Sequence, residues 1–227
     1  NHRPVDRTQP FYMAFVSPFQ EFVTRKGMWE AIVLILFIFL YKLGDSLATS
    51  LQTYFILDMG FTTSHITAVV KTTSFWCSIG GGILGGIAML KIGVNRALWL
   101  FGFVQLITIL GFAYLASFGK FETASIGMLE LIRLGVVMAG EYLGVGLGTA
   151  AFVAFMARET NPMYTAMQLA IFTSLAAIPS KLLGAYAGKM VEAVGYYDFF
   201  WICFFLAIPG MLMLFKVAPW QEKTKQA

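Results

Sequence analysis

The chain has 227 residues, of which 58% are hydrophobic and 12% are charged, and its formal net charge is +4. A soluble domain carries roughly 45–50% apolar and about 25% charged residues. This composition excludes an ordinary soluble globule, a disordered chain and a nucleic-acid-binding domain, and it predicts a protein that crosses a membrane several times.

Residues 1–27 differ from the rest because they are polar and contain several prolines. Near their end, Phe19, Phe22 and Val23 share one face of a helix. We expect a cytoplasmic linker that ends in a short amphipathic helix lying at the membrane interface. The alternative is a linker that only happens to contain aromatic residues.

Six apolar segments follow, and each is long enough to cross a bilayer core of about 30 Å, which needs roughly 20 helical residues. They cover residues 28–57, 64–90, 95–118, 126–157, 162–190 and 196–217. The alternation typical of membrane β-strands is missing from them. The sequence therefore predicts an all-α membrane protein with six transmembrane helices over residues 28–218 and a cytoplasmic tail over residues 219–227.

Glycine and turn-forming residues indicate helix ends and helix contacts. Gly60 is placed to end the first helix, and Asn161 to cap the fifth with Pro162 at its first position. Small residues four apart permit close helix packing. Such spacings occur at Gly81/Gly85, Gly82/Gly86 and Gly140/Gly144/Gly148.

The basic residues indicate the orientation in the membrane. With both ends in the cytoplasm, ten of the 16 Lys and Arg residues lie in or beside cytoplasmic segments, two in outside loops and four within spans. Cytoplasmic loops carry an excess of Lys and Arg. The modest positive charge is therefore a mark of orientation.

A polar stripe runs along the first predicted helix. Lys42, Asp45, Thr49 and Gln52 follow one another at spacings of three and four residues, so they share one helix face. Such a stripe favours a water-accessible path or a substrate cavity. The alternative is a buried Lys42–Asp45 pair that only holds helices together.

Three further polar residues stand in other predicted spans. Lys71 lies in the second, Glu141 midway along the fourth and Gln168 near the cytoplasmic end of the fifth. A charge at the bilayer centre costs at least about 2.5–3.5 kcal/mol. We expect Lys42, Asp45, Thr49, Gln52, Lys71 and Gln168 to line a substrate cavity. Glu141 is the first candidate for carrying a proton and Asp45 the second, because Lys42 should keep Asp45 ionised.

Metal, cofactor and enzyme chemistry find little support in the sequence. The two cysteines lie in apolar runs and the two histidines stand apart, so we expect no disulfide, no metal and no cofactor. An intramembrane enzyme would need a nucleophile–base or metal pair at helical spacing, and the spans contain neither HExxH nor GxSxG. A non-transporting scaffold stays open as a remote alternative.

The junction GIAMLKIGVNR, from Gly86 to Arg96, resembles the loop signature of the major facilitator superfamily. Gly86, Lys91, Gly93 and Arg96 match, whereas Leu90 stands in place of the acidic residue. The resemblance implies one half, the C-terminal half, of a twelve-helix transporter whose N-terminal six-helix half completes it. The first residue is Asn, which fits a chain that begins in the loop between the halves.

A narrower resemblance is to the AmpG-type anhydromuropeptide permeases. It is carried by PFQEF from Pro18, YKLGD from Tyr41, Lys71-Thr72, GTAAFVA from Gly148 and QLA from Gln168. It implies a proton-driven permease of the bacterial inner membrane that imports GlcNAc-anhydroMurNAc peptides for peptidoglycan recycling and, in some bacteria, β-lactamase induction. A facilitator for another bulky anion, such as acetyl-CoA or a siderophore, is the alternative.

Overall fold

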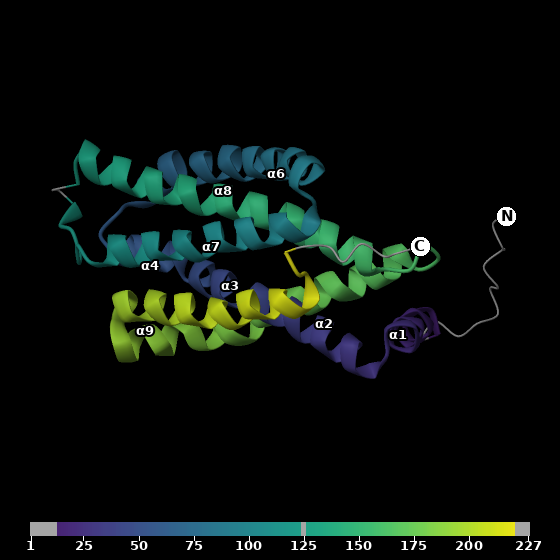
Figure 1. The fold of residues 1–227 in the computed structure, drawn as a ribbon. Coiled ribbons are helices and arrows are strands. Elements are labelled where there is room, and N and C mark those ends of the chain that lie inside the picture. Colours follow the sequence, from purple (N-terminus) through teal and green to yellow (C-terminus); the bar gives the residue numbers. More distant parts are fainter. Residues whose placement is uncertain (1–12, 124–125, 221–227) are drawn as a thin grey trace.

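The computed structural model describes residues 13–123 and 126–220, where the regular structure is helical throughout (Figure 1). Much of the predicted linker (1–12) and most of the predicted tail (221–227) lie outside the described residues. The elements are α1 (Met13–Lys26), α2 (Met28–Tyr41), α3 (Leu43–Ser50), α4 (Gln52–Asp58), α5 (Thr63–His65), the π-helix η1 (Ile66–Lys71), α6 (Thr72–Ile92), α7 (Val94–Ala116), α8 (Met128–Glu159) and α9 (Thr165–Val217).

The first predicted span is a row of three helices instead of one. The backbone leaves ideal helical geometry at Lys42, where φ is −97° and ψ is 0°, and at Leu51, where φ is −104° and ψ is 4°. The row ends at Gly60, whose φ of 100° is the left-handed conformation expected there. Lys42, one of the predicted site residues, lies at the first of these breaks.

The second predicted span begins with a π-helix, which a hydropathy pattern cannot reveal. One turn of α-helix, α5, precedes the π-helix, and Thr62 caps it reciprocally: its side chain accepts from His65 N, and His65 Nδ1 accepts from Thr62 N, both at 3.3 Å. His65, which stands apart from other histidines in the sequence, therefore serves as part of a helix cap. The π-helix then ends at Lys71.

The last 53-residue helix, α9, is two helices in sequence. Gly195 has φ 80° and ψ 166°, which is not helical, and the parts before and after it run antiparallel in Figure 1. The described residues contain five helical runs long and apolar enough to cross a membrane, with α9 counted once. At 1.5 Å per residue, the parts of α9 before and after Gly195 are about 45 Å and about 33 Å long, so each is at least as long as the bilayer core of about 30 Å.

The predicted start of the fifth helix is wrong. Residues 161–164 form a turn, in which Asn161 Oδ1 accepts from Met163 N at 2.9 Å, and the helix begins only at Thr165. The amide side chain of Asn161 can stabilise a tight turn as readily as it caps a helix.

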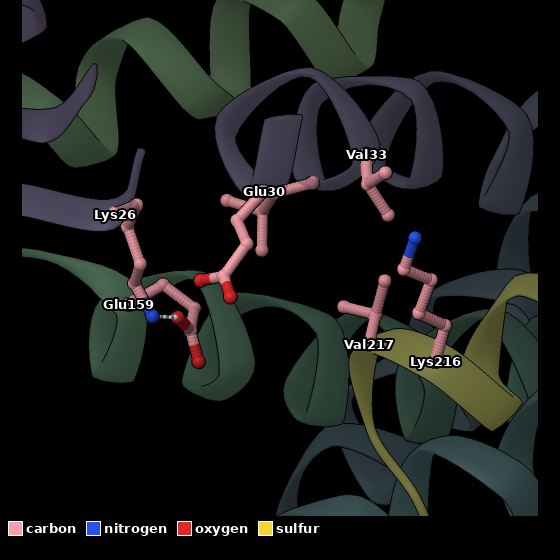
Figure 2. A pocket seen from close by; sticks show the side chains of 7 residues that line it. Lys26, Glu30, Val33, Glu159, Lys216 and Val217 are labelled. Atoms are coloured by element: carbon pink, nitrogen blue, oxygen red, sulfur yellow. Dashed lines mark hydrogen bonds and ion pairs between the residues drawn. The ribbon is translucent and has the colours of Figure 1, made fainter. Parts of the chain in front are cut away.

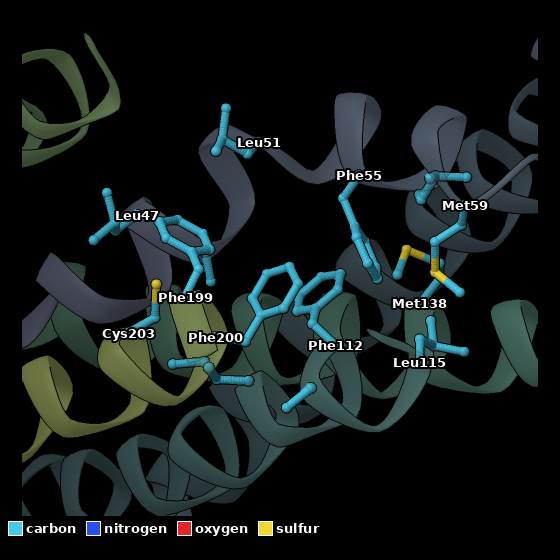
Figure 3. Packing of buried hydrophobic residues seen from close by; sticks show 14 of the residues in the cluster. Leu47, Leu51, Phe55, Met59, Phe112, Leu115, Met138, Phe199, Phe200 and Cys203 are labelled. Atoms are coloured by element: carbon cyan, nitrogen blue, oxygen red, sulfur yellow. The ribbon is translucent and has the colours of Figure 1, made fainter. Parts of the chain in front are cut away.

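Aromatic side chains hold the helices together in two buried clusters. In the first, Phe200 of α9 stacks on Phe112 of α7 at 5.1 Å and meets Phe55 of α4 at 4.9 Å (Figure 3). In the second, Phe37 of α2 meets Phe155 of α8 edge to face at 5.4 Å. Both clusters tie the broken first span to the longer helices α7, α8 and α9.

Close packing of α6 on α8 uses one of the two predicted glycine pairs. A Cβ on Gly81 would lie 2.5 Å from Leu143 O, and one on Gly85 would meet Leu147 at 3.2 Å. A Cβ on Gly82 or Gly86, by contrast, would meet nothing within 4 Å among the described residues. The helix therefore presents its Gly81/Gly85 face to α8.

Candidate functional site

The break between α2 and α3 places Lys42 beside a pocket of about 300 Å³. The pocket lies between the first span and the helices α8 and α9. Its walls include Lys42, Asp45, Ser46, Thr149, Phe152 and Thr173. The lining is charged at the helix break and mostly apolar along α8 and α9, where Thr149 and Thr173 are its polar members.

Lys42 and Asp45 form an ion pair within this pocket. The Nζ of Lys42 lies 3.2 Å from Asp45 Oδ2, and both side chains are only 11% exposed. Lys42 also donates to Thr149 Oγ1 of α8 at 3.5 Å. The ammonium thus joins the first span to α8 at the pocket wall.

Glu141 lies behind this pair, on α8, and is fully buried. It interacts electrostatically with Asp45 and Lys42 and lies near Thr108 of α7. Neither of its carboxyl oxygens, nor Oδ1 of Asp45, reaches hydrogen-bond geometry with a described residue. Two carboxyl groups therefore share one ammonium, and a single bound proton would make the cluster neutral. We call Lys42, Asp45 and Glu141 the charged cluster.

The remaining residues of the predicted stripe, Thr49 and Gln52, make hydrogen bonds inside the protein. Thr49 Oγ1 donates to Asp45 O at 2.8 Å, within its own helix. Gln52 is buried; its Oε1 accepts from Tyr142 OH at 3.1 Å and its Nε2 lies 3.3 Å from Met138 Sδ. The stripe therefore points at α8 over this part of its length.

Lys71 and Gln168 are not joined to the charged cluster. Lys71 is exposed at the end of the π-helix, and its ammonium has no ion-pair or hydrogen-bond partner within the part of the chain that the structure describes. Gln168 is buried, and its Nε2 donates to Pro18 O at 2.8 Å and to Glu21 Oε2 at 2.6 Å. Its amide fixes α1 to α9.

The contact between α1 and α9 is electrostatic as well as apolar. Phe22 is buried against Phe172 at 5.1 Å, and Glu21 accepts hydrogen bonds from Asn161 and Gln168, both at 2.6 Å. Burial acts to raise the pKa of Glu21, but these hydrogen bonds and the charge of Arg25 outweigh it and hold the pKa below its ordinary value.

Three polar residues near the charged cluster were not predicted as site residues. They are Thr149 and Thr108, described above, and Gln105 of α7, which is buried against Gly148 and whose Nε2 has no hydrogen-bond partner among the described residues. Gln105 and Thr108 stand one helical turn apart in an otherwise apolar span. Two polar residues one turn apart in an apolar span are the sequence feature from which this pair could have been predicted.

The described residues offer no group of three or more His, Cys, Asp or Glu side chains that could hold a metal ion. The described residues that line the pocket include no histidine that could act as a base for Thr149 or Ser46. The arrangement can instead hold an anionic group at Lys42 and bind a proton at its carboxyls.

Comparison with known proteins gives related sequences along nearly the whole chain. No family model matches it. An uncharacterized protein of Haemophilus influenzae is 62% identical over 218 residues, 96% of this chain and 51% of that protein. The anhydromuropeptide permease of Escherichia coli K12 is 34% identical over 212 residues, 93% of this chain and 40% of the permease. Over nearly its whole length the chain is similar to the AmpG-type permeases.

More distant AmpG-type relatives are also similar along most of the chain. The protein named AmpG 4 of Rickettsia felis is 28% identical over 201 residues, 88% of this chain and 46% of that protein. The chain thus spans about half the length, or less, of the curated relatives it matches. The AmpG-type relatives are named as a permease and transporters and not as enzymes, and with the apolar helices they point to a multi-pass protein of the inner membrane.

Proposed function

We propose that the chain forms one six-helix half of a twelve-helix major facilitator transporter, with both its ends in the cytoplasm. The break at Gly195 and the length of α9 support two crossings by that helix, which brings the total to six. The bias of basic residues supports the orientation. The matched relatives, about twice as long, support a second half of similar size.

The proposed cargo is an anhydromuropeptide, carried from the periplasm to the cytoplasm for peptidoglycan recycling and driven by the proton gradient. The name of the Escherichia coli relative supports the cargo. The observation that carries a coupled mechanism is the charged cluster, buried behind an open pocket with two carboxyls to one ammonium. A buried carboxyl without a full set of partners is costly unless it binds a proton.

The residues divide into two roles in this proposal. The ammonium of Lys42 meets a carboxylate of the cargo, and the exposed Lys71 is available to a second one. Glu141 carries the proton and Asp45 passes the change in charge to Lys42. When cargo binds Lys42, Asp45 loses its counter-ion, which favours protonation of the cluster. Thr49, Gln52 and Gln168 act indirectly, by holding the helices around the pocket.

Uptake into right-side-out vesicles tests this function. Vesicles from cells that lack other muropeptide permeases and make this protein should accumulate labelled anhydromuropeptide when a pH gradient is imposed. Glu141→Gln should abolish that accumulation and keep exchange of labelled for unlabelled cargo, since exchange needs no net proton movement. Glu192→Gln, an exposed carboxyl elsewhere on α9, is the matched control. Unchanged gradient-driven uptake in Glu141→Gln and Asp45→Asn would refute the coupling.

The same vesicles distinguish the alternative cargoes. If acetyl-CoA or a siderophore competes with the label better than unlabelled muropeptide does, the protein carries another bulky anion. If no cargo accumulates under any gradient, a non-transporting role replaces the proposal.

A further inference from the structure

A second pocket, separate from the charged cluster, opens where α2 begins and α9 ends (Figure 2). Its volume is about 210 Å³, smaller than the roughly 300–1,000 Å³ of a site that encloses a whole drug-sized ligand. It therefore suits a headgroup or another small polar group. The residues that line it include Lys26, Glu30, Val33, Glu159, Lys216 and Val217.

Four charged side chains reach this pocket, and two of them neutralise each other. Lys26 Nζ of α1 lies 2.5 Å from Glu159 Oε2 of α8. Glu30 of α2 and Lys216 of α9 remain, and neither forms an ion pair with a described residue. The pocket thus offers one carboxylate and one ammonium on separate walls, and its four charges sum to zero.

Exposed tryptophans mark this end of the bundle as the level expected for lipid headgroups. Trp29, 66% exposed, and Trp220, 47% exposed, stand at this end of the bundle, and tryptophan is enriched where a membrane protein meets the bilayer surface. The Nζ of Lys216 lies 4.9 Å from the centre of the Trp29 ring, which fixes the ammonium beside the pocket.

An apolar path leads from the pocket along the same two helices. Ile32 and Leu36 on α2 are exposed, and so are Leu212 and Phe215 on α9. Ile32 and Leu36 share one face of α2 with Trp29, which lies beside Lys216. Leu212 stands one turn before Lys216 on α9, so two apolar strips begin at the Lys216 side of the pocket. Acyl chains attached to a headgroup in the pocket would lie against these strips.

We infer that this pocket binds the headgroup of a phospholipid in which a phosphate and a primary ammonium are joined by a short linker, as in phosphatidylethanolamine. Lys216 donates to the phosphate, and Glu30 accepts from the ammonium. Both contacts are charge-assisted hydrogen bonds, which are the strong ones. Because the pocket has no net charge, it favours a zwitterionic headgroup over an anionic one. The inference does not depend on the cargo or on its direction of transport.

Native mass spectrometry of the detergent-purified protein tests the inference directly. The protein is titrated with phosphatidylethanolamine, phosphatidylcholine and phosphatidylglycerol of identical acyl chains. The first lipid should bind about tenfold more tightly than the other two, since choline has no N–H to donate and glycerol has no charge. Equal binding of all three, or a preference for phosphatidylglycerol, overturns the inference.

Variants separate the two contacts. Glu30→Gln should remove the preference for phosphatidylethanolamine over phosphatidylcholine, whereas Glu30→Asp should keep most of it. Lys216→Gln should weaken both lipids by about tenfold. Glu192→Gln and Lys189→Gln remove exposed charges elsewhere on α9 and should leave all three lipids unchanged. A preference that survives Glu30→Gln assigns the ammonium to another site and overturns the inference.

A soluble headgroup distinguishes a lipid from a dissolved ligand. Glycerophosphoethanolamine carries the same phosphate and ammonium without acyl chains. It should displace phosphatidylethanolamine only at concentrations at least about a hundredfold higher, because the chains add apolar contact. Binding of the soluble compound as tightly as the lipid would assign the pocket to a dissolved zwitterion and overturn the lipid assignment.

Discussion

Lys42 and Asp45 form a 3.2 Å ion pair across the break between α2 and α3, and Glu141 approaches that pair from α8. A helix break and an ion pair therefore occupy the same turn of the chain. The break matters because it directs Lys42 toward the pocket and Thr149, while Asp45 is buried in the wall of the same pocket.

The Lys42–Asp45 pair should contribute to stability as a unit. Lys42→Met or Asp45→Asn alone leaves one buried charge without its partner, and loss of one partner of a buried pair costs about 3–5 kcal/mol. The double variant should lose clearly less than the two single losses together. Thermal unfolding in detergent measures this cycle, with Asp198→Asn, an exposed carboxyl, as the control expected within about 0.5 kcal/mol. Additive losses would show that the two charges act separately.

Thr149 should matter for cargo affinity, because its hydroxyl holds Lys42 at the pocket wall. Thr149→Val keeps the shape and removes a hydrogen bond worth about 0.5–1.5 kcal/mol. The KM for muropeptide uptake should rise about two- to tenfold with little change in the maximal rate. Thr53→Val, at an exposed site, should change neither constant. A fall in maximal rate at unchanged KM would place the hydroxyl in the transport step instead.

The two faces of α6 should respond oppositely to one added methyl group. In Gly81→Ala the Cβ would lie 2.5 Å from the backbone oxygen of Leu143, so α6 and α8 must separate, at a cost of about 1–3 kcal/mol. In Gly82→Ala the Cβ meets nothing within 4 Å, and the helix gains up to about 1 kcal/mol of propensity. Unfolding temperatures of the two variants compare them directly, and equal values would contradict the packing seen here.

Docking of α1 on α9 should weaken in acid. The pKa of Glu21 in the docked state lies below its ordinary value of 4.5, so its contribution is complete above that value and is lost as the pH falls through the lowered pKa. The protection factor of the α1 amides, which is the intrinsic exchange rate divided by the observed rate, should therefore fall below about pH 4.5. In Glu21→Gln the exchange of the α1 amides should no longer depend on the protonation of this side chain. Exchange in wild type that shows no acid step would mean that Glu21 does not stabilise docking.

Composition and hydropathy were enough to predict an all-α membrane protein, because apolar runs of about 20 residues have few other uses. The same patterns could not predict the breaks at Lys42 and Leu51 or the π-helix before Lys71, since these change backbone geometry without changing residue polarity. They also placed the start of the fifth helix too early, because Asn161 serves turns and caps equally well.

Helical spacing by itself determined that Lys42 and Asp45 share a face and can pair, and burial of Glu141 followed from its place in an apolar span. Only the tertiary structure decided which residues meet: it brings Glu141 and Thr149 of α8 to that pair and commits Gln168 to α1 instead. The physical reason is that contacts within one helix are fixed by its period, whereas contacts between helices depend on packing angles and on which glycine face, such as Gly81 or Gly82, lies against the neighbour.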